Sequence, residues 1–321
     1  MLWFRHGCSE ANLKCVAENT ASRQIFYLAL PGAILFNLHS ISSPIGSLRR
    51  GSALYTFRGK YVLVTGSSSG LGSAFAEALA ARGANVVLNG RSAKSLHRLA
   101  ERLREQYPVR IEVADADISA PSAPARISRR LEQLGITIDL LINNAGVGTV
   151  GPFLSHSIEK EMVQVRLSVI GLTSLTHHFA RQMVAIGNGG ILNVASTSAF
   201  RPVPCMAIYG ATKAFVLMFS EALAAELKES GVHVMTACPG PMATRFLANS
   251  NASITLRNMD SADLVAERTL EDFARGLPVS YPGRFSGRVA TLLSRFLPRG
   301  AMVWLAMRAA KRMGFCCPSR S

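Results

Sequence analysis

The chain has 321 residues, of which 49% are hydrophobic and 17% charged; this excludes a largely disordered protein and predicts a sizeable apolar core. Six cysteines show neither metal-ligand spacing nor a disulfide framework, so we expect a reducing compartment and no metal site. The net charge of +15 is compatible with a nucleic acid, a membrane surface or an anionic ligand. From Arg275 onward there are nine Lys and Arg and no Asp or Glu.

Residues 1–56 carry no assignable motif. Within them, Ile25 to Leu38 is apolar except for Pro31, Gly32 and Asn37, and its length of about 14 residues is short of the roughly 20 that span a bilayer. The segment is compatible with a removable leader, a shallow membrane anchor, an organelle presequence or an extension that never folds.

A strand, a glycine-rich turn and a helix are predicted next. The run YVLVT at 61–65 is apolar and partly β-branched, and an amphipathic pattern follows over 73–83. Between them, Gly66, Gly70 and Gly72 form TGxxxGxG, in which glycines permit a tight turn and close approach of a pyrophosphate to a helix N-terminus. An ordinary turn between strand and helix remains the alternative.

A second buried strand, 84–88, ends in Asn89-Gly90-Arg91-Ser92 with no acidic residue to accept a hydrogen bond from a ribose hydroxyl. The guanidinium of Arg91 suits a phosphate, and Ser68 and Ser69 add hydroxyl donors, which favours NADP over NAD. Arg91 is otherwise a solvated loop residue.

Strands continue to alternate with helices, which predicts an α/β fold with a doubly wound, mostly parallel sheet. Asp117 follows the third strand and Asn144 the fourth, at the carboxyl edge where such sheets bind ligands. Asp117 is placed to meet an adenine amino group, although both residues are also ordinary turn formers. We predict one folded domain over 57–250, an N-terminal extension over 1–56, and a C-terminal lid or basic region over 251–321.

A Ser, a Tyr and a Lys are brought together by the next elements. Tyr209 and Lys213 lie four residues apart in an expected helix and so share one face, and Ser196 ends the apolar run ILNVA. A phenol has a pKa near 10 and works as an acid or base at neutral pH only if a cation such as Lys213 favours the phenolate. The loop Pro239-Gly240-Pro241-Met242-Ala243-Thr244 follows the sixth strand.

Together these motifs resemble those of the short-chain dehydrogenase/reductase family over about residues 57–246. TGxxxGxG, NNAG, a Ser thirteen residues before YxxxK, and PGxxxT occur in that order. The resemblance implies a Rossmann fold, and the Arg91 pattern is similar to that of the NADP-dependent members. The residues expected to bind the cofactor are Gly66, Ser68, Ser69, Gly70, Leu71, Gly72, Arg91, Asp117, Asn144, Tyr209, Lys213, Pro239, Gly240 and Thr244.

The resemblance also implies the catalytic roles. Tyr209 would be the general acid in carbonyl reduction, Lys213 would lower its pKa and hold the nicotinamide ribose, and Ser196 would hydrogen bond to the substrate oxygen. Asn144 would help to position the cofactor, and Thr244 would contact its nicotinamide end. The chain departs from the family pattern at Ser168, where many members have an Asn that supports a water and a proton path to the Lys.

These features predict an NADP(H)-dependent oxidoreductase that interconverts a carbonyl and an alcohol; the alternative is a catalytically impaired NADP(H)-binding sensor or scaffold. Apolar residues in the segments expected over the nicotinamide favour a hydrophobic substrate: Phe153, Phe200, Val203, Met206, Phe246 and Leu247.

The tail from Arg284 onward has two apolar segments with interspersed Arg, separated by Pro298. This pattern suits an anionic membrane surface or a helix pair that packs over the substrate pocket. No nucleic-acid motif accompanies the charge, so we expect no nucleic-acid partner. We expect a homo-oligomer that is cytoplasmic and peripheral to a membrane.

Overall fold

The computed structural model describes residues 15–20, 23–28, 54–242, 259–283 and 297–316, and the chain forms two compact units, Met1–Ala53 and Leu54–Ser321. In the first unit, β1 (Cys15–Thr20) pairs antiparallel with β2 (Arg23–Leu28). The apolar segment predicted over 25–38 begins inside β2, and its residues after Leu28 lie outside the described ranges. Its role stays a prediction.

The second unit is built on a seven-stranded parallel sheet with the order β5-β4-β3-β6-β7-β8-β9. The strands are β3 (Tyr61–Thr65), β4 (Asn85–Asn89), β5 (Ile111–Val113), β6 (Leu140–Asn143), β7 (Gly189–Val194), β8 (Val232–Ala237) and β9 (Val279–Ser280). The chain leaves β3 toward β4 on one side and later returns to β6 on the other. The carboxyl ends of β3 and β6 therefore flank the switch point at which such sheets bind ligands.

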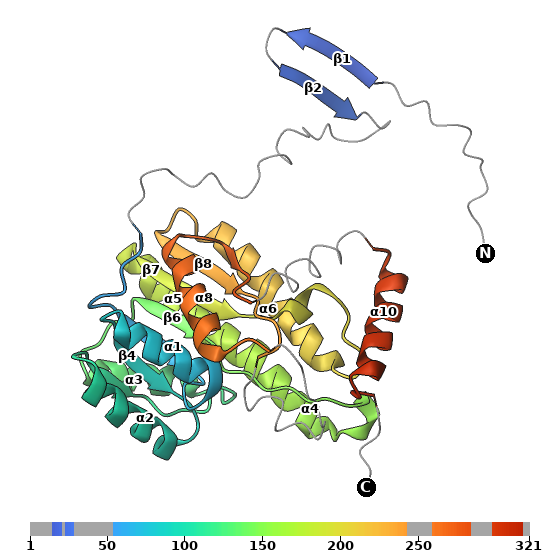
Figure 1. The fold of residues 1–321 in the computed structure, drawn as a ribbon. Coiled ribbons are helices and arrows are strands. Elements are labelled where there is room, and N and C mark those ends of the chain that lie inside the picture. Colours follow the sequence, from blue (N-terminus) through green and yellow to red (C-terminus); the bar gives the residue numbers. More distant parts are fainter. Residues whose placement is uncertain (1–14, 21–22, 29–53, 243–258, 284–296, 317–321) are drawn as a thin grey trace, which may run out of the picture. The chain divides into compact units, whose positions relative to one another are not determined.

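Helices cover both faces of this sheet (Figure 1). They are α1 (Gly70–Ala81), α2 (Ala93–Gln106), α3 (Ala123–Gln133), α4 (Ile158–Val165), α5 (Leu172–Ile186), α6 (Ala207–Glu226), α8 (Ala262–Ala274) and α10 (Arg299–Arg312). Val62 and Val64 face one core, with α1, α2 and α8, while Leu63 faces the other, with α3 and α5. Because successive side chains of a strand point to opposite faces, a strand covered on both sides reads as a continuous apolar run. The predicted doubly wound fold is confirmed.

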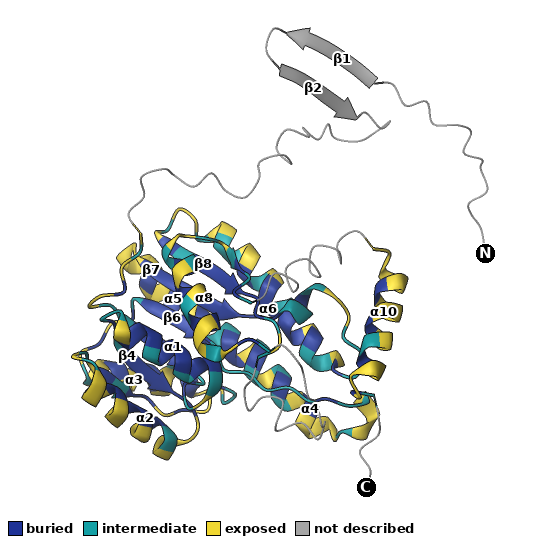
Figure 2. Cartoon of the chain, viewed as in Figure 1, coloured by how far each residue is buried: buried dark blue, intermediate teal, exposed yellow. Residues whose placement is uncertain are grey.

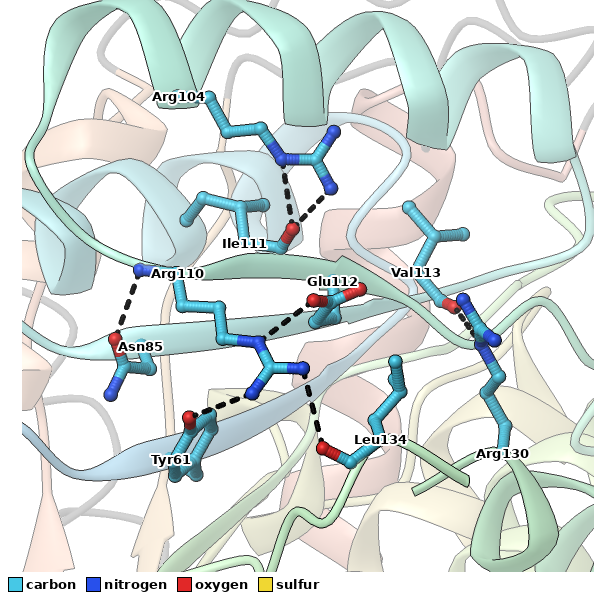
Figure 3. Close-up of polar contacts among 9 residues, drawn as sticks. All are labelled: Tyr61, Asn85, Arg104, Arg110, Ile111, Glu112, Val113, Arg130 and Leu134. Carbon is cyan, nitrogen blue, oxygen red and sulfur yellow. Dashed lines mark hydrogen bonds and ion pairs between the residues drawn. The ribbon is translucent and has the colours of Figure 1, made fainter. Parts of the chain in front are cut away.

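The short edge strand β5 is closed by arginines from neighbouring helices (Figure 3). Arg104 of α2 donates to the carbonyl of Ile111, and Arg130 of α3 donates to that of Val113 at 3.4 Å. These carbonyls alternate with those that bond to β4, so the guanidinium groups satisfy acceptors at the free edge of the sheet. Part of the excess positive charge therefore serves the fold itself.

Residues 158–186 do not form one regular α-helix. Between α4 and α5, residues Arg166–Gly171 form a π-helical turn, η3. A Cβ on Gly171 would lie 2.3 Å from the carbonyl oxygen of Ile118, so only glycine permits this close approach. Such turns often occur at functional sites, and this one carries Ser168.

The region after residue 250 supplies structural elements as well as a tail. Helix α8 packs on α1, and β9 extends the sheet beside β8. Within the described ranges, the helix long and apolar enough to cross a bilayer by length and composition is α6, which carries Tyr209 and Lys213 and packs against β8. Its packing in the domain is a sufficient reason for its apolar composition.

Candidate active site

The glycine turn after β3 is held by close packing against the end of β6. Gly66 has a φ of +67°, and a Cβ there would lie 2.8 Å from Cα of Ala145. A Cβ on Gly72 would lie 2.2 Å from the carbonyl oxygen of Gly66, and Gly70 begins α1 with a φ of +59°. Ser69 at the N-cap makes no side-chain hydrogen bond to α1, which leaves the first N–H groups of the helix available for an anion.

Asn144 and Thr65 fix this turn. The amide of Asn144 donates to the carbonyls of Thr65 and Gly66, at 3.0 and 3.4 Å. Oγ1 of Thr65 accepts from the backbone N–H groups of Asn144 and Ala145 at 3.0 and 3.1 Å. Asn144 therefore positions the loop predicted to cradle the cofactor; direct contact with the cofactor stays a prediction.

The groups predicted for the adenosine end gather after β4 and β5. Ser67 donates through both N–H and Oγ to the carbonyl of Asn89, and a Cβ on Gly90 would lie 3.6 Å from Oγ of Ser68. Partial burial raises the pKa of Asp117, but hydrogen bonds from Ser119 and the positive charge of Arg91 lower it by more. Arg91 is exposed, and its positive charge acts on Asp117; that the two residues bind one cofactor stays a prediction.

Ser196 and Tyr209 are hydrogen bonded to each other. Ser196 is 7% exposed at the end of β7, and its Oγ also accepts from the N–H of Ser198 at 3.1 Å. Tyr209 lies in the first turn of α6. Burial raises the pKa of Tyr209, and the hydrogen bond with Ser196 lowers it by less, so the net shift is upward. The structure thus favours the protonated phenol, the form that can donate a proton.

Lys213 lies on the same face of α6 as Tyr209. Its Nζ is 5.9 Å from the centre of the Tyr209 ring and donates to the carbonyl of Val194 at 2.7 Å. Burial lowers the pKa of Lys213 to about 8, with a smaller opposing effect of Cys238. A pKa near 8 leaves the ammonium mostly charged at neutral pH.

Ser168 lies close to this lysine. A Cβ on Gly146 would be 3.5 Å from Nζ of Lys213 and 4.0 Å from Oγ of Ser168. Ser168 is 2% exposed, and its Oγ has no hydrogen-bond partner among the residues that the structure describes. A buried hydroxyl of this kind is a natural partner for a bound water.

The predicted loop after β8 adjoins the site through its first residue, since the carbonyl of Pro239 accepts from the N–H of Thr197 at 2.9 Å. Thr244, like Phe246 and Leu247, lies outside the described residues. No cluster of three or more metal-ligating side chains occurs in the part of the chain that the structure describes.

The apolar wall beside Tyr209 differs from the predicted one. Val203 and Met206 do pack with Tyr209, but Phe200 packs with Tyr281 at a ring separation of 5.8 Å, and Phe153 is 46% exposed. The wall also includes Val150 and three residues of the C-terminal segment, Ala310, Phe315 and Cys316. Packing of this segment beside the site is one of the two alternatives that its sequence allowed.

A disulfide joins Cys205 to Cys316, so the prediction of cysteines without a disulfide is wrong. The two residues are 111 positions apart, and their spacing carries no signal of pairing. Folding brings their Cα atoms to 5.6 Å. The bond ties the C-terminal segment to the loop that precedes Tyr209.

A buried amide network behind the site also escaped prediction. Nδ2 of Asn143 donates to Thr176 and to Oδ1 of Asn193, and Nδ2 of Asn193 donates to Ser220, each at 2.9 Å. The network links β6, β7, α5 and α6, and so fixes the helix that carries Tyr209. The sequence did contain a signal for this network, because Asn143 and Asn193 each occur in an otherwise apolar strand.

Comparison with known proteins places the chain in a family. A family model described as short chain dehydrogenase matches residues 60–255. The chain belongs to the short-chain dehydrogenase/reductase family. The predicted family is thus confirmed, together with the class of fold.

Three relatives of this dehydrogenase/reductase bear on its chemistry. A very-long-chain 3-oxoacyl-CoA reductase of Danio rerio is 33% identical over 205 residues, which cover 63% of this chain and 64% of that protein. A short-chain dehydrogenase from Sphingobium yanoikuyae, solved in complex with NADPH, is 35% identical with a TM-score of 0.68, covering 76% and 95% of the two chains. A Comamonas testosteroni alcohol dehydrogenase specific for bulky-bulky ketones is 33% identical with a TM-score of 0.65, covering 74% and 91%.

Proposed function

We propose that this short-chain dehydrogenase/reductase is an NADP(H)-dependent oxidoreductase that interconverts a carbonyl and an alcohol on a hydrophobic substrate. The observation that carries the proposal is the hydrogen-bonded pair of Ser196 and Tyr209 beside the buried Lys213. All three lie at the carboxyl edge of the sheet, next to the switch point.

The residues at this edge fit NADP(H). Gly66 and Gly72 keep side chains away from the turn, and α1 offers free N–H groups to a pyrophosphate. Arg91 and Ser68 would hold the additional phosphate, and Lys213 the nicotinamide ribose. The complex of the Sphingobium relative with NADPH supports this choice of cofactor. When bound, NADPH supplies a hydride, and the protein supplies position and a proton.

Tyr209 would donate its phenolic proton to the carbonyl oxygen of the substrate. Ser196 would donate a hydrogen bond to the same oxygen, and together they stabilise the negative charge that develops there. In the oxidative direction the phenolate is the base, and the charge of Lys213 favours its formation. Ser168, with its unpartnered Oγ, would hold a water near Lys213 for return of the proton.

The apolar wall supports a hydrophobic substrate. Val150, Val203, Met206 and Phe315 pack in one apolar cluster with Tyr209. The relatives that act on very-long-chain 3-oxoacyl-CoA and on bulky-bulky ketones point the same way. If the purified protein reduces polar keto sugars faster than hydrophobic ketones, this part of the proposal fails.

A second candidate is a catalytically impaired NADP(H)-binding sensor, which the presence of Ser168 in place of the family's Asn favours. A panel of hydrophobic and polar carbonyls and alcohols, each tested with NADPH and NADH, separates the two candidates. Turnover that prefers NADPH supports the enzyme; tight NADPH binding with no turnover on any compound supports the sensor.

The sharpest test is Tyr209→Phe. Because a positioned general acid contributes about 10²–10⁴-fold to rate, we expect kcat to fall by that factor while the Kd for NADPH stays within about twofold. Tyr107→Phe, at the C-cap of α2, is the matched control and should leave both quantities unchanged. Full turnover in Tyr209→Phe would contradict the assignment.

A further inference from the structure

Helix α10 contacts the rest of the domain along one narrow line. Its buried residues are Met302, Ala306 and Ala310, one in every four, which places them in a single row along the helix. Ala310, the last residue of this row, packs with Val150 and Phe315 in the cluster that includes Tyr209. Most of the circumference of α10 therefore faces away from the protein (Figure 2).

The outward part of α10 is both apolar and basic. Trp304 is 60% exposed, and Val303 and Leu305 are each 44% exposed. The helix also carries four exposed basic residues and no acidic one: Arg299, Arg308, Lys311 and Arg312. The guanidinium of Arg308 lies 5.6 Å from the centre of the Trp304 ring. Large apolar side chains exposed at this density are not needed for folding and mark an interaction surface.

A second exposed apolar group, Leu154 and Ile158, follows Val150 in the chain, and Val150 packs near the C-terminal end of α10. Val150 packs with Ala310 and Phe315, and the chain then passes directly into η2 (Phe153–Ser155). Leu154 is 92% exposed, and Ile158, at the start of α4, is 56% exposed. Glu159 and Lys160 beside them are exposed charges of opposite sign, so this group adds apolar area without changing the net charge.

We infer that the outward face of α10, together with Leu154 and Ile158, docks on the surface of an anionic lipid bilayer. Trp, Lys and Arg side chains on one short helix are the combination that membrane interfaces favour. Four basic groups without an acidic partner on the helix complement anionic headgroups. Docking would place the bilayer beside the apolar cluster that includes Tyr209, which gives an apolar substrate a route from the membrane; this last step alone rests on the proposed function.

Vesicle binding tests the inference without any turnover. The full-length protein is sedimented with two kinds of vesicle. One is pure phosphatidylcholine, and the other also contains about 30% phosphatidylserine, which gives it a strong negative surface potential. The triple variant Arg308→Gln, Lys311→Gln, Arg312→Gln should lose roughly 100-fold in partitioning to the anionic vesicles. A charge-matched control, Arg129→Gln, Arg181→Gln, Lys228→Gln, removes exposed basic residues elsewhere and should bind like wild type.

The position of Trp304 supplies a second, independent readout. The chain has two tryptophans, so Trp3→Phe leaves Trp304 as the only one. Brominated lipids in anionic vesicles should then quench its fluorescence and shift its emission to the blue. Vesicle binding with Trp304 unquenched, or equal binding by the two triple variants, would overturn the inference. So would a change of oligomeric state in the α10 variant with no change in vesicle binding, since a second copy of the chain would then cover the face.

Discussion

Burial shifts the pKa values of Lys213 and Tyr209 in opposite directions, and in each case it disfavours the charged form of the side chain. The pKa of Lys213 falls to about 8, and that of Tyr209 rises despite its hydrogen bond with Ser196. Spacing in the sequence predicted that the two side chains share a face, but not how deeply they are buried. In reduction, where Tyr209 gives up a proton, the protonated phenol is the form required, so the upward shift suits this direction.

The pKa of Lys213 predicts how cofactor affinity depends on pH. The charged ammonium is the form that would hold the ribose hydroxyls; it is present below about pH 8 and is lost as pH rises through that value. Between pH 7 and pH 9 the charged fraction falls about tenfold, so we expect the Kd for NADPH to rise by up to about tenfold. Fluorescence titration of NADPH across this range measures it. Lys213→Met should show weak, pH-independent binding, and an equal slope in this variant would contradict the assignment.

Ser168 gives a second prediction at this scale. If its Oγ holds a water that returns protons toward Lys213, Ser168→Ala should lower kcat by roughly threefold to tenfold, a part of the ~10²–10⁴ that a general acid contributes. The solvent isotope effect on kcat should rise, and NADPH affinity should not change. Thr173→Val is the control, because Oγ1 of Thr173, in the first turn of α5, is also buried without a hydrogen-bond partner among the described residues. An equal loss in both variants would indicate a packing effect.

At the scale of elements, the central strands were predictable because helices cover them on both faces, so their sequences are continuous apolar runs. The strand predicted over 61–65 has those bounds in the structure. The π-helical turn was not predictable from local pattern, and the close approach of Gly171 to Ile118 joins residues that are distant in sequence. β9 has two residues, too few for any periodicity, and its place depends on pairing with β8.

The disulfide belongs to this scale because it holds one element in place. Cys205 has a φ of +62°, unusual for a residue other than glycine, and its carbonyl accepts from the N–H of Gly151 at 2.9 Å. Within the described part of the chain, the buried residues of α10 itself are those of its single row, Met302, Ala306 and Ala310. A reducing compartment would keep these two cysteines as free thiols. The disulfide is therefore at odds with the prediction of a reducing, cytoplasmic location.

Removal of the bond should loosen α10 before the rest of the domain. We expect Cys316→Ser to lower the free energy of unfolding by about 2–5 kcal/mol, as for other disulfides that close long loops. Trypsin should cut after Arg308, Lys311 or Arg312 under conditions in which the sheet stays intact. Cys8→Ser is the control, and wild type treated with a reductant should behave like Cys316→Ser. Equal trypsin resistance of oxidised wild type and Cys316→Ser would show that the bond does not anchor the helix.

At the scale of the whole molecule, composition predicted a positive excess but not its uses. Arg104 and Arg130 close the edge of the sheet, Arg91 lies at the proposed phosphate site, and the basic residues of α10 face outward. Charge counts cannot separate these uses, because each depends on which face the fold presents. The proximity of the candidate site residues was predictable for a different reason: short motifs after consecutive parallel strands must meet at one edge of the sheet. No such rule predicts which residues of the C-terminal segment pack beside the site.

The division into two units predicts where the chain can be cut. The unit that begins at Leu54 contains the whole sheet and every described residue of the site, so deletion of residues 1–53 should leave NADPH affinity unchanged and Tm within about 2 °C. Deletion of residues 1–58 is the matched comparison. It removes the backbone hydrogen bond from Tyr55 to Ala274 and the buried ring of Phe57 from its contacts with Phe273.

Loss of a buried Phe side chain alone costs about 3–5 kcal/mol, which lowers Tm by roughly 6–20 °C in a domain of this size. Thermal unfolding of the two truncated proteins, followed by circular dichroism, compares them directly. A large fall in Tm for both deletions would mean that residues before Leu54 stabilise the domain. No fall for either would mean that the aromatic contacts of Tyr55 and Phe57 are dispensable.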